Sequence, residues 1–144
     1  MKKRIAINLS ATLVTVMLLS GWACQTNYAK AGQLAKDFAA SVLVAQQVEI
    51  ELHKAGKIDD ALHQSIQNEF LEISSAGVRL DIAINQSHNA TGAIAQIQVL
   101  DTLMSDLSNN KITGIKDTNT RLAIQSALLS VRTILDSIAA FGGK

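Results

Sequence analysis

The sequence contains no proline, and only 3% of its residues are aromatic. Because proline breaks or kinks helices, its absence from a chain of 144 residues permits long uninterrupted helices. With few large rings, the core must be built from aliphatic side chains and alanine, which suit helices that pack closely together. We therefore expect an all-α protein with one modest core.

A strong charge of either sign is also lacking. The net charge is +1, and the part of the chain after Cys24 carries ten basic and twelve acidic side chains, a net charge of −2. No basic patch is visible, so nucleic acid is not expected as a partner. Glycine-rich phosphate loops and a Gly-x-Ser-x-Gly turn are absent too. We expect a protein that is not an enzyme and that has no cofactor.

The start of the chain has the layout of a secretory signal peptide. Lys2, Lys3 and Arg4 precede an apolar run over residues 5–19, and small residues come after it. The run is about 15 residues long, shorter than the roughly 20 that a permanent transmembrane helix needs. The basic start favours retention of this end in the cytoplasm and export of the rest of the chain. The sequence thus predicts a signal peptide at residues 1–23 and an exported bacterial protein.

The lone cysteine, Cys24, comes directly after this leader. The letters LLSGWAC resemble a bacterial lipobox, in which the cysteine is acylated and becomes the first residue of a lipoprotein. Ala23 fits that pattern, whereas Gly21 and Trp22 depart from it. The resemblance implies lipidation of Cys24 and attachment to a membrane through that lipid. Because Gln25 rather than aspartate comes next, it also implies an outer-membrane anchor.

Two other endings of the leader remain open. Cleavage after Ala23 fits a small-x-small pattern, and cleavage after Ala31 fits the sequence Ala-Lys-Ala. Either one predicts a free periplasmic protein without a lipid anchor.

Beyond the leader, apolar residues recur at spacings of three and four, which is typical of amphipathic helices. We expect a tether at residues 24–30 and a bundle domain at 31–144. Its four helices are predicted at about residues 31–55, 60–84, 93–108 and 118–141. Gly56 is expected to end the first helix, and Asp59 or Asp60 to cap the second. The fourth is expected to be capped by Asp117 or Thr118, and residues 85–92 are predicted to form a loop.

Each predicted helix has one stripe of residues expected to face the core. In chain order these are Leu34, Phe38, Val42, Ala45, Val48, Leu52 and Ala55; Leu62, Ile66, Phe70, Ile73, Gly77, Leu80 and Ile84; Ala93, Ile97, Leu100, Met104 and Leu107; and Ile124, Leu128, Val131, Leu135 and Ile138. Short connections between such helices favour an antiparallel, up-down four-helix bundle. The alternative is a three-helix bundle with the first helix extending away as a stalk.

Two helices carry further apolar residues on their opposite sides. Leu43 and Ile50 lie off the main stripe of the first helix, and Leu71, Val78 and Ile82 lie off that of the second. Such residues indicate either a helix that is central in the bundle or a face that binds another chain. We favour the first interpretation and keep these five residues as the candidate partner-binding set.

One cluster of residues with metal-ligand chemistry is predicted at the first hairpin. His53 falls in the last turn of the first helix, and Asp59, Asp60 and His63 fall at the start of the second. A bound metal would need three or four of these side chains to converge at about 2.0–2.2 Å. Preferences of aspartate and histidine for helix ends explain the same residues without a metal.

These patterns leave two functions from different classes. The first is a non-enzymatic envelope or periplasmic protein that acts through protein contact, as a structural, accessory or inhibitory component. Its partner would be an unidentified envelope protein or a second copy of the chain. The alternative is a helical bundle that binds a metal or a small ligand at its first hairpin.

Overall fold

The computed structural model describes the backbone of residues 3–142 and the side chains of residues 27–141. The described backbone forms four α-helices: α1 (Lys3–Lys54), α2 (Asp60–Asp81), α3 (Ala90–Asp106) and α4 (Thr118–Gly142). Two π-helical turns, η1 (Ile82–Gln86) and η2 (Leu107–Lys111), and the 3₁₀ turn η3 (Ile112–Gly114) complete the helical part. No strand occurs in this range, so the predicted all-α class is confirmed.

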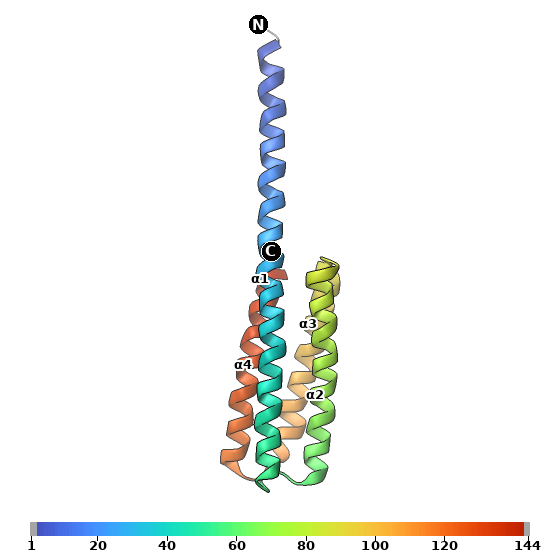
Figure 1. Ribbon diagram of the computed structural model, residues 1–144, viewed down its shortest axis with the longest axis vertical. Helices are drawn as coiled ribbons and strands as arrows, with labels where there is room; N and C mark the ends of the chain where they lie inside the picture. The colour runs from blue at the N-terminus through green and yellow to red at the C-terminus, as the bar shows by residue number, and fades with distance from the viewer. Residues whose placement is uncertain (1–2, 143–144) are drawn as a thin grey trace.

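Successive helices run in opposite directions and form the predicted up-down four-helix bundle (Figure 1). α1 packs against α2 and α4, and α3 packs against the same two helices. The four helices therefore surround one core, with α1 as a full member of the bundle. The alternative with a separate first helix as a stalk is wrong for the packed part of α1.

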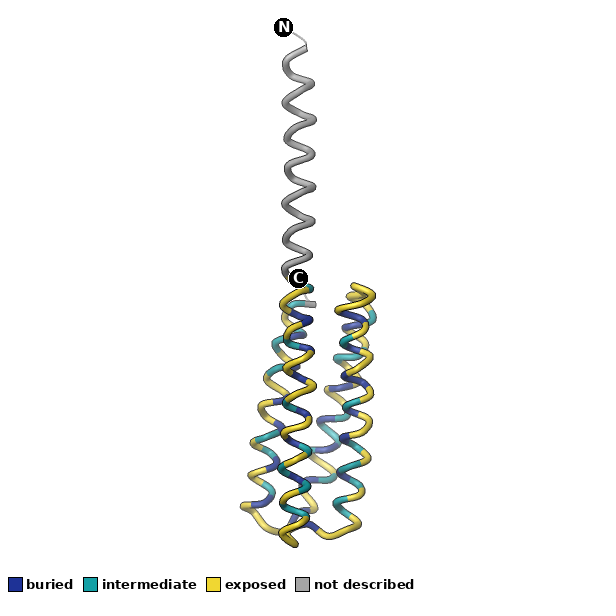
Figure 2. Tube along the Cα trace, in the orientation of Figure 1, coloured by how far each residue is buried: buried dark blue, intermediate teal, exposed yellow. Residues whose placement is uncertain are grey.

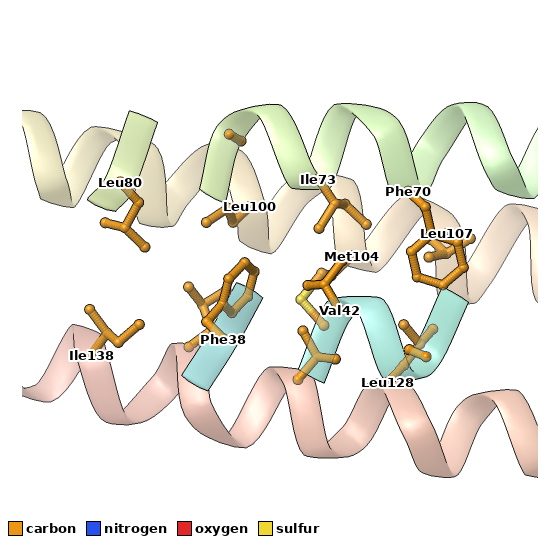
Figure 3. Close-up of a cluster of buried hydrophobic side chains, with 14 of the residues drawn as sticks. Phe38, Val42, Phe70, Ile73, Leu80, Leu100, Met104, Leu107, Leu128 and Ile138 are labelled. Carbon is orange, nitrogen blue, oxygen red and sulfur yellow. The ribbon is translucent and has the colours of Figure 1, made fainter. Parts of the chain in front are cut away.

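The predicted stripes supply the core (Figures 2 and 3). Phe38 of α1 and Phe70 of α2 are its largest fully buried side chains. All five residues of the α4 stripe are buried, and so are six of the seven in the second stripe. Gly77 lies in that second stripe, and a Cβ built there would come within 3.1 Å of a ring carbon of Phe38. Alternating large and small residues thus bring α1 and α2 close together.

The helix ends depend on local chemistry that the sequence predicts. Gly56 has a φ of +71°, and its amide donates to the carbonyl of His53 while the amide of Lys57 donates to that of Leu52. These two bonds form a Schellman motif that closes α1. Asp59 caps α2 by accepting a hydrogen bond from the amide of Leu62 at 2.8 Å.

The connection between α2 and α3 is shorter than predicted. Ile82–Gln86 continues α2 as a π-helical turn, and α3 begins at Ala90 rather than near Ala93. Asn89 causes the early start, because its side-chain oxygen accepts a hydrogen bond from the amide of Gly92 at 2.9 Å and caps the helix. Residues expected in a loop therefore form the first turn of α3.

Packed structure begins within the segment predicted as a tether. Tyr28 lies in α1, contacts the core, and its hydroxyl donates to the backbone carbonyl of His88 at 3.0 Å. Its ring also meets the imidazole of His88 edge to face, with centroids 5.0 Å apart. These contacts join α1 to the α2–α3 connection. Cys24 and the rest of the predicted leader lie outside the residues whose side chains are described.

α4 is the one helix in the described part of the chain that is long and apolar enough to cross a membrane, over Thr118–Phe141. Its apolar stripe is the side that packs into the bundle, and its outer side carries charged residues such as Arg132 and Asp136. The core of the bundle accounts for part of this composition, since 28% of the apolar window is buried, whereas Leu122 and Leu129 remain exposed.

Candidate functional site

A buried carboxylate lies between α1 and α2, near the turn that joins them. The side chain of Glu49 on α1 is 0% exposed. Its Oε1 accepts a hydrogen bond from Nδ1 of His63 at 2.9 Å, and Oε2 accepts one from Nε2 of Gln67. Burying a carboxylate is costly unless such donors replace water, so His63 and Gln67 make the burial of Glu49 possible.

Further polar groups extend this contact along the α1–α2 interface. Nε2 of Gln46 donates to Oε1 of Gln67 at 2.6 Å. In the other direction, the rings of His63 and His53 are stacked, with centroids 3.8 Å apart and an angle of 6° between their planes. Nε2 of His53 lies 2.9 Å from a carboxylate oxygen of Asp60. We call these six residues the polar ladder: Gln46, Glu49, His53, Asp60, His63 and Gln67.

The ladder sets the register of α1 against α2. In the observed register, α1 residue 49 is level with α2 residues 63–67, and no buried side-chain polar atom in the described residues lacks a partner. Sliding α2 by one turn would bring Asp59 or Leu71 into the place of one of the two donors, and the Glu49 carboxylate would lose one hydrogen bond at a cost of about 1–3 kcal/mol. The ladder thus acts as a specificity element of the fold.

The predicted metal ligands do not form a metal site. His53, Asp60 and His63 lie together, but Asp59 is turned away and caps α2. The two imidazole rings are stacked face to face, and each directs one nitrogen to a different carboxylate. Among the described residues, no three or more His, Cys, Asp or Glu side chains are placed to hold one ion. The arrangement therefore does not support the metal-site hypothesis.

Sequence reasoning missed the burial of Glu49. The apolar stripes predict no buried acid, although Glu49 lies four residues after Ala45 and therefore on the inner side of α1. A charged residue on the inner side of a helix is the sequence feature that could have indicated a buried polar contact. Its partners, His63 and Gln67, cannot be identified from α1 alone, because it is the packing of α2 that brings them opposite Glu49.

Two carboxyl groups elsewhere have shifted pKa values. Partial burial, with the negative charges of Asp106 and Glu72 nearby, raises the pKa of Glu69 above 4.5. Hydrogen bonds from the hydroxyl and the amide of Thr120 lower the pKa of Asp117, which caps α4. Neither group lies in the ladder, and the cap role of Asp117 agrees with prediction.

The outer face of α1 and α2 carries exposed aliphatic side chains. Leu43 is 63% exposed, Leu71 66%, Val78 60% and Ile82 39%, whereas Ile50 is half-buried. Our preferred interpretation, in which these residues belong to a wide core, is wrong for the four exposed ones. They lie on the sides of α1, of α2 and of its η1 extension that face away from the buried stripes. We call these four residues the apolar face: Leu43, Leu71, Val78 and Ile82.

A groove with a volume of about 430 Å³ runs between α1 and α2 beside the apolar face. Leu43 and Val78 form part of its walls, and its floor and sides include the small residues Ala39, Ser74 and Gly77. The other exposed large aliphatic side chains in the described region are Val44 on α1, Ile94 and Val99 on α3, and Leu122 and Leu129 on α4. The α1–α2 face therefore combines the largest exposed aliphatic group with a hollow.

Comparison with known proteins returned no match among family models, curated proteins or solved structures.

Proposed function

We propose that this protein is a small exported bacterial protein without enzymatic activity, which acts in the cell envelope by binding protein through the apolar face. The exposure of Leu71 and Val78 next to a groove is the observation that carries the proposal. Clustered aliphatic side chains that remain in water lower the free energy of any complex that covers them. In the polar ladder, each carboxylate and imidazole is hydrogen-bonded to a neighbour, which gives these residues a structural role in the packing of α1 against α2.

The envelope location rests on the leader. Its basic start, short apolar run and small residues support export, and Cys24 supports a lipid anchor by its resemblance to a lipobox. Bundle packing from Tyr28 onward leaves only a few residues between Cys24 and the folded domain. An acylated Cys24 would thus hold the bundle close to the membrane surface.

The location is tested by the intact mass of the mature chain from membranes and from periplasm. We expect acyl chains on residue 24 in the membrane fraction, and their loss in the variant Cys24→Ser. An unmodified chain in the soluble fraction would contradict the lipid anchor but not the export.

The binding role is tested by chemical cross-linking in intact cells of a tagged full-length chain. The double variant Leu71→Ser, Val78→Ser should lose its cross-linked product while its helical circular dichroism is unchanged, because both side chains are exposed. Leu122→Ser, Leu129→Ser is the matched control on α4, since these leucines are similarly exposed on another helix. Equal loss in both variants, or no cross-linked product from the wild type, would contradict the proposal.

A further inference from the structure

We infer that a second copy of this chain covers the apolar face, in a parallel twofold dimer with α1 of each copy against α2 of the other. This inference rests on the proposed function and names its partner. Two features of the face support it: its register and its charges.

The register brings leucines of the two copies together across a twofold axis that runs parallel to the helices. The contacts of Phe38 with Gly77 and of Gln46 with Gln67 place α1 and α2 level at those positions. Leu43 is therefore level with Leu71, at the same height on the neighbouring helix. A rotation of 180° about an axis parallel to the helices exchanges α1 and α2 in the facing copy. Leu43 of one copy then meets Leu71 of the other, and the reverse contact forms by symmetry.

The charges at one end of the groove are complementary under the same symmetry. Lys36 on α1 and Asp81 on α2 both line the groove. Neither takes part in an ion pair within the described residues of one chain. The register brings them to nearly the same height, so Lys36 of each copy faces Asp81 of the other across the dimer. An antiparallel pairing would instead oppose α1 to α1 and would not bring these charges together.

The side of the bundle that carries the apolar face also leaves room for polar contacts around it. α2 spans 22 residues, or about 33 Å, and two helices side by side are about 18–20 Å wide. The flat footprint of this whole side is thus about 600 Å², and the apolar face, from Leu71 to Ile82, takes about half of it. The roughly 800 Å² of accessible surface that each partner buries in a stable complex therefore includes polar residues around the face. The parallel arrangement further keeps both Cys24 residues at the same end of the dimer, as attachment of both chains to one membrane requires.

Charge reversal tests this geometry in the full-length chain, with mass measured by sedimentation in detergent. The wild type should be a dimer, and Lys36→Glu and Asp81→Lys should each weaken it about tenfold or more, since each creates two like-charge contacts. The double variant should restore the dimer. A mixture of the two single variants should do the same, because both of its contacts then join opposite charges. Lys116→Glu, in the exposed α3–α4 connection, is the control and should have no effect.

A monomeric wild type overturns the inference, as do single variants that dimerise normally or a mixture that stays monomeric. A second experiment distinguishes failure of the dimer from failure of the proposed function. It introduces a photo-cross-linking residue at position 78 of the chain in cells. An adduct with twice the mass of the chain supports the dimer. An adduct with a different protein overturns the dimer but leaves the proposed function standing, and the absence of any adduct contradicts both.

Discussion

Replacing His63 with alanine isolates the role of the polar ladder. The change removes the donor to Oε1 of Glu49 and leaves a fully buried carboxylate with Gln67 as its described side-chain donor. Removing one partner of a buried, hydrogen-bonded carboxylate costs about 3–5 kcal/mol. The side chain of His63 is 25% exposed, so water can partly replace it and the cost should fall near the lower end, at about 3 kcal/mol. That is a large share of the roughly 5–15 kcal/mol that stabilises a typical domain.

Part of the stability that His63→Ala loses should return when the buried carboxylate of Glu49 is removed as well. Glu49→Leu in the same chain fills a similar volume without a carboxylate, and it should recover about 2 kcal/mol of the loss. Urea unfolding followed by circular dichroism of the full-length wild type, both single variants and the double variant gives the coupling energy. Glu51→Leu is the control, because Glu51 is an exposed carboxylate on the same helix and should not rescue His63→Ala.

The reasoning would be refuted by His63→Ala losing less than about 1 kcal/mol with no rescue by Glu49→Leu. Such a result would mean that the carboxylate reaches solvent and that the register of α1 and α2 depends on apolar packing alone.

Three other outcomes are expected. Gly56→Ala should lower the free energy of unfolding by about 1 kcal/mol, since alanine is strained at the φ of +71°, and an unchanged urea midpoint would contradict this. Asp117→Ala should destabilise the fold above pH 3.8, the ordinary pKa of aspartate. The difference in free energy of unfolding between wild type and variant should vanish as the pH falls through the lowered pKa of Asp117, because the protonated side chain has lost its charge. Urea unfolding at pH 7 and pH 2.5 measures this difference, and an equal difference at both pH values would contradict the prediction. Zinc or a chelator should leave the melting temperature unchanged; a rise with zinc that His63→Ala abolishes would revive the metal hypothesis.

Much of the fold could be predicted from the chain because helix periodicity is a local property. Phe70 and Leu80 fall on one side of any helix that contains both, so the stripe of α2 can be read from spacing alone. Gly56 and Asp59 end and start helices through bonds to residues within five positions, which need no tertiary contact. The boundary at Ala90 is misplaced because asparagine is common in loops, although the side chain of Asn89 can also cap a helix.

Tertiary structure alone decided which off-stripe residues are buried. Glu49 is enclosed because α2 brings His63 and Gln67 opposite it, a match between residues 14 and 18 positions away that no spacing within α1 contains. Leu71 and Val78 look like core residues by hydropathy, yet they remain in water. The angular width of a buried stripe depends on how many helices surround it and how closely they approach. That is a property of the assembled bundle, whereas the sequence of one helix determines only the direction in which each side chain points.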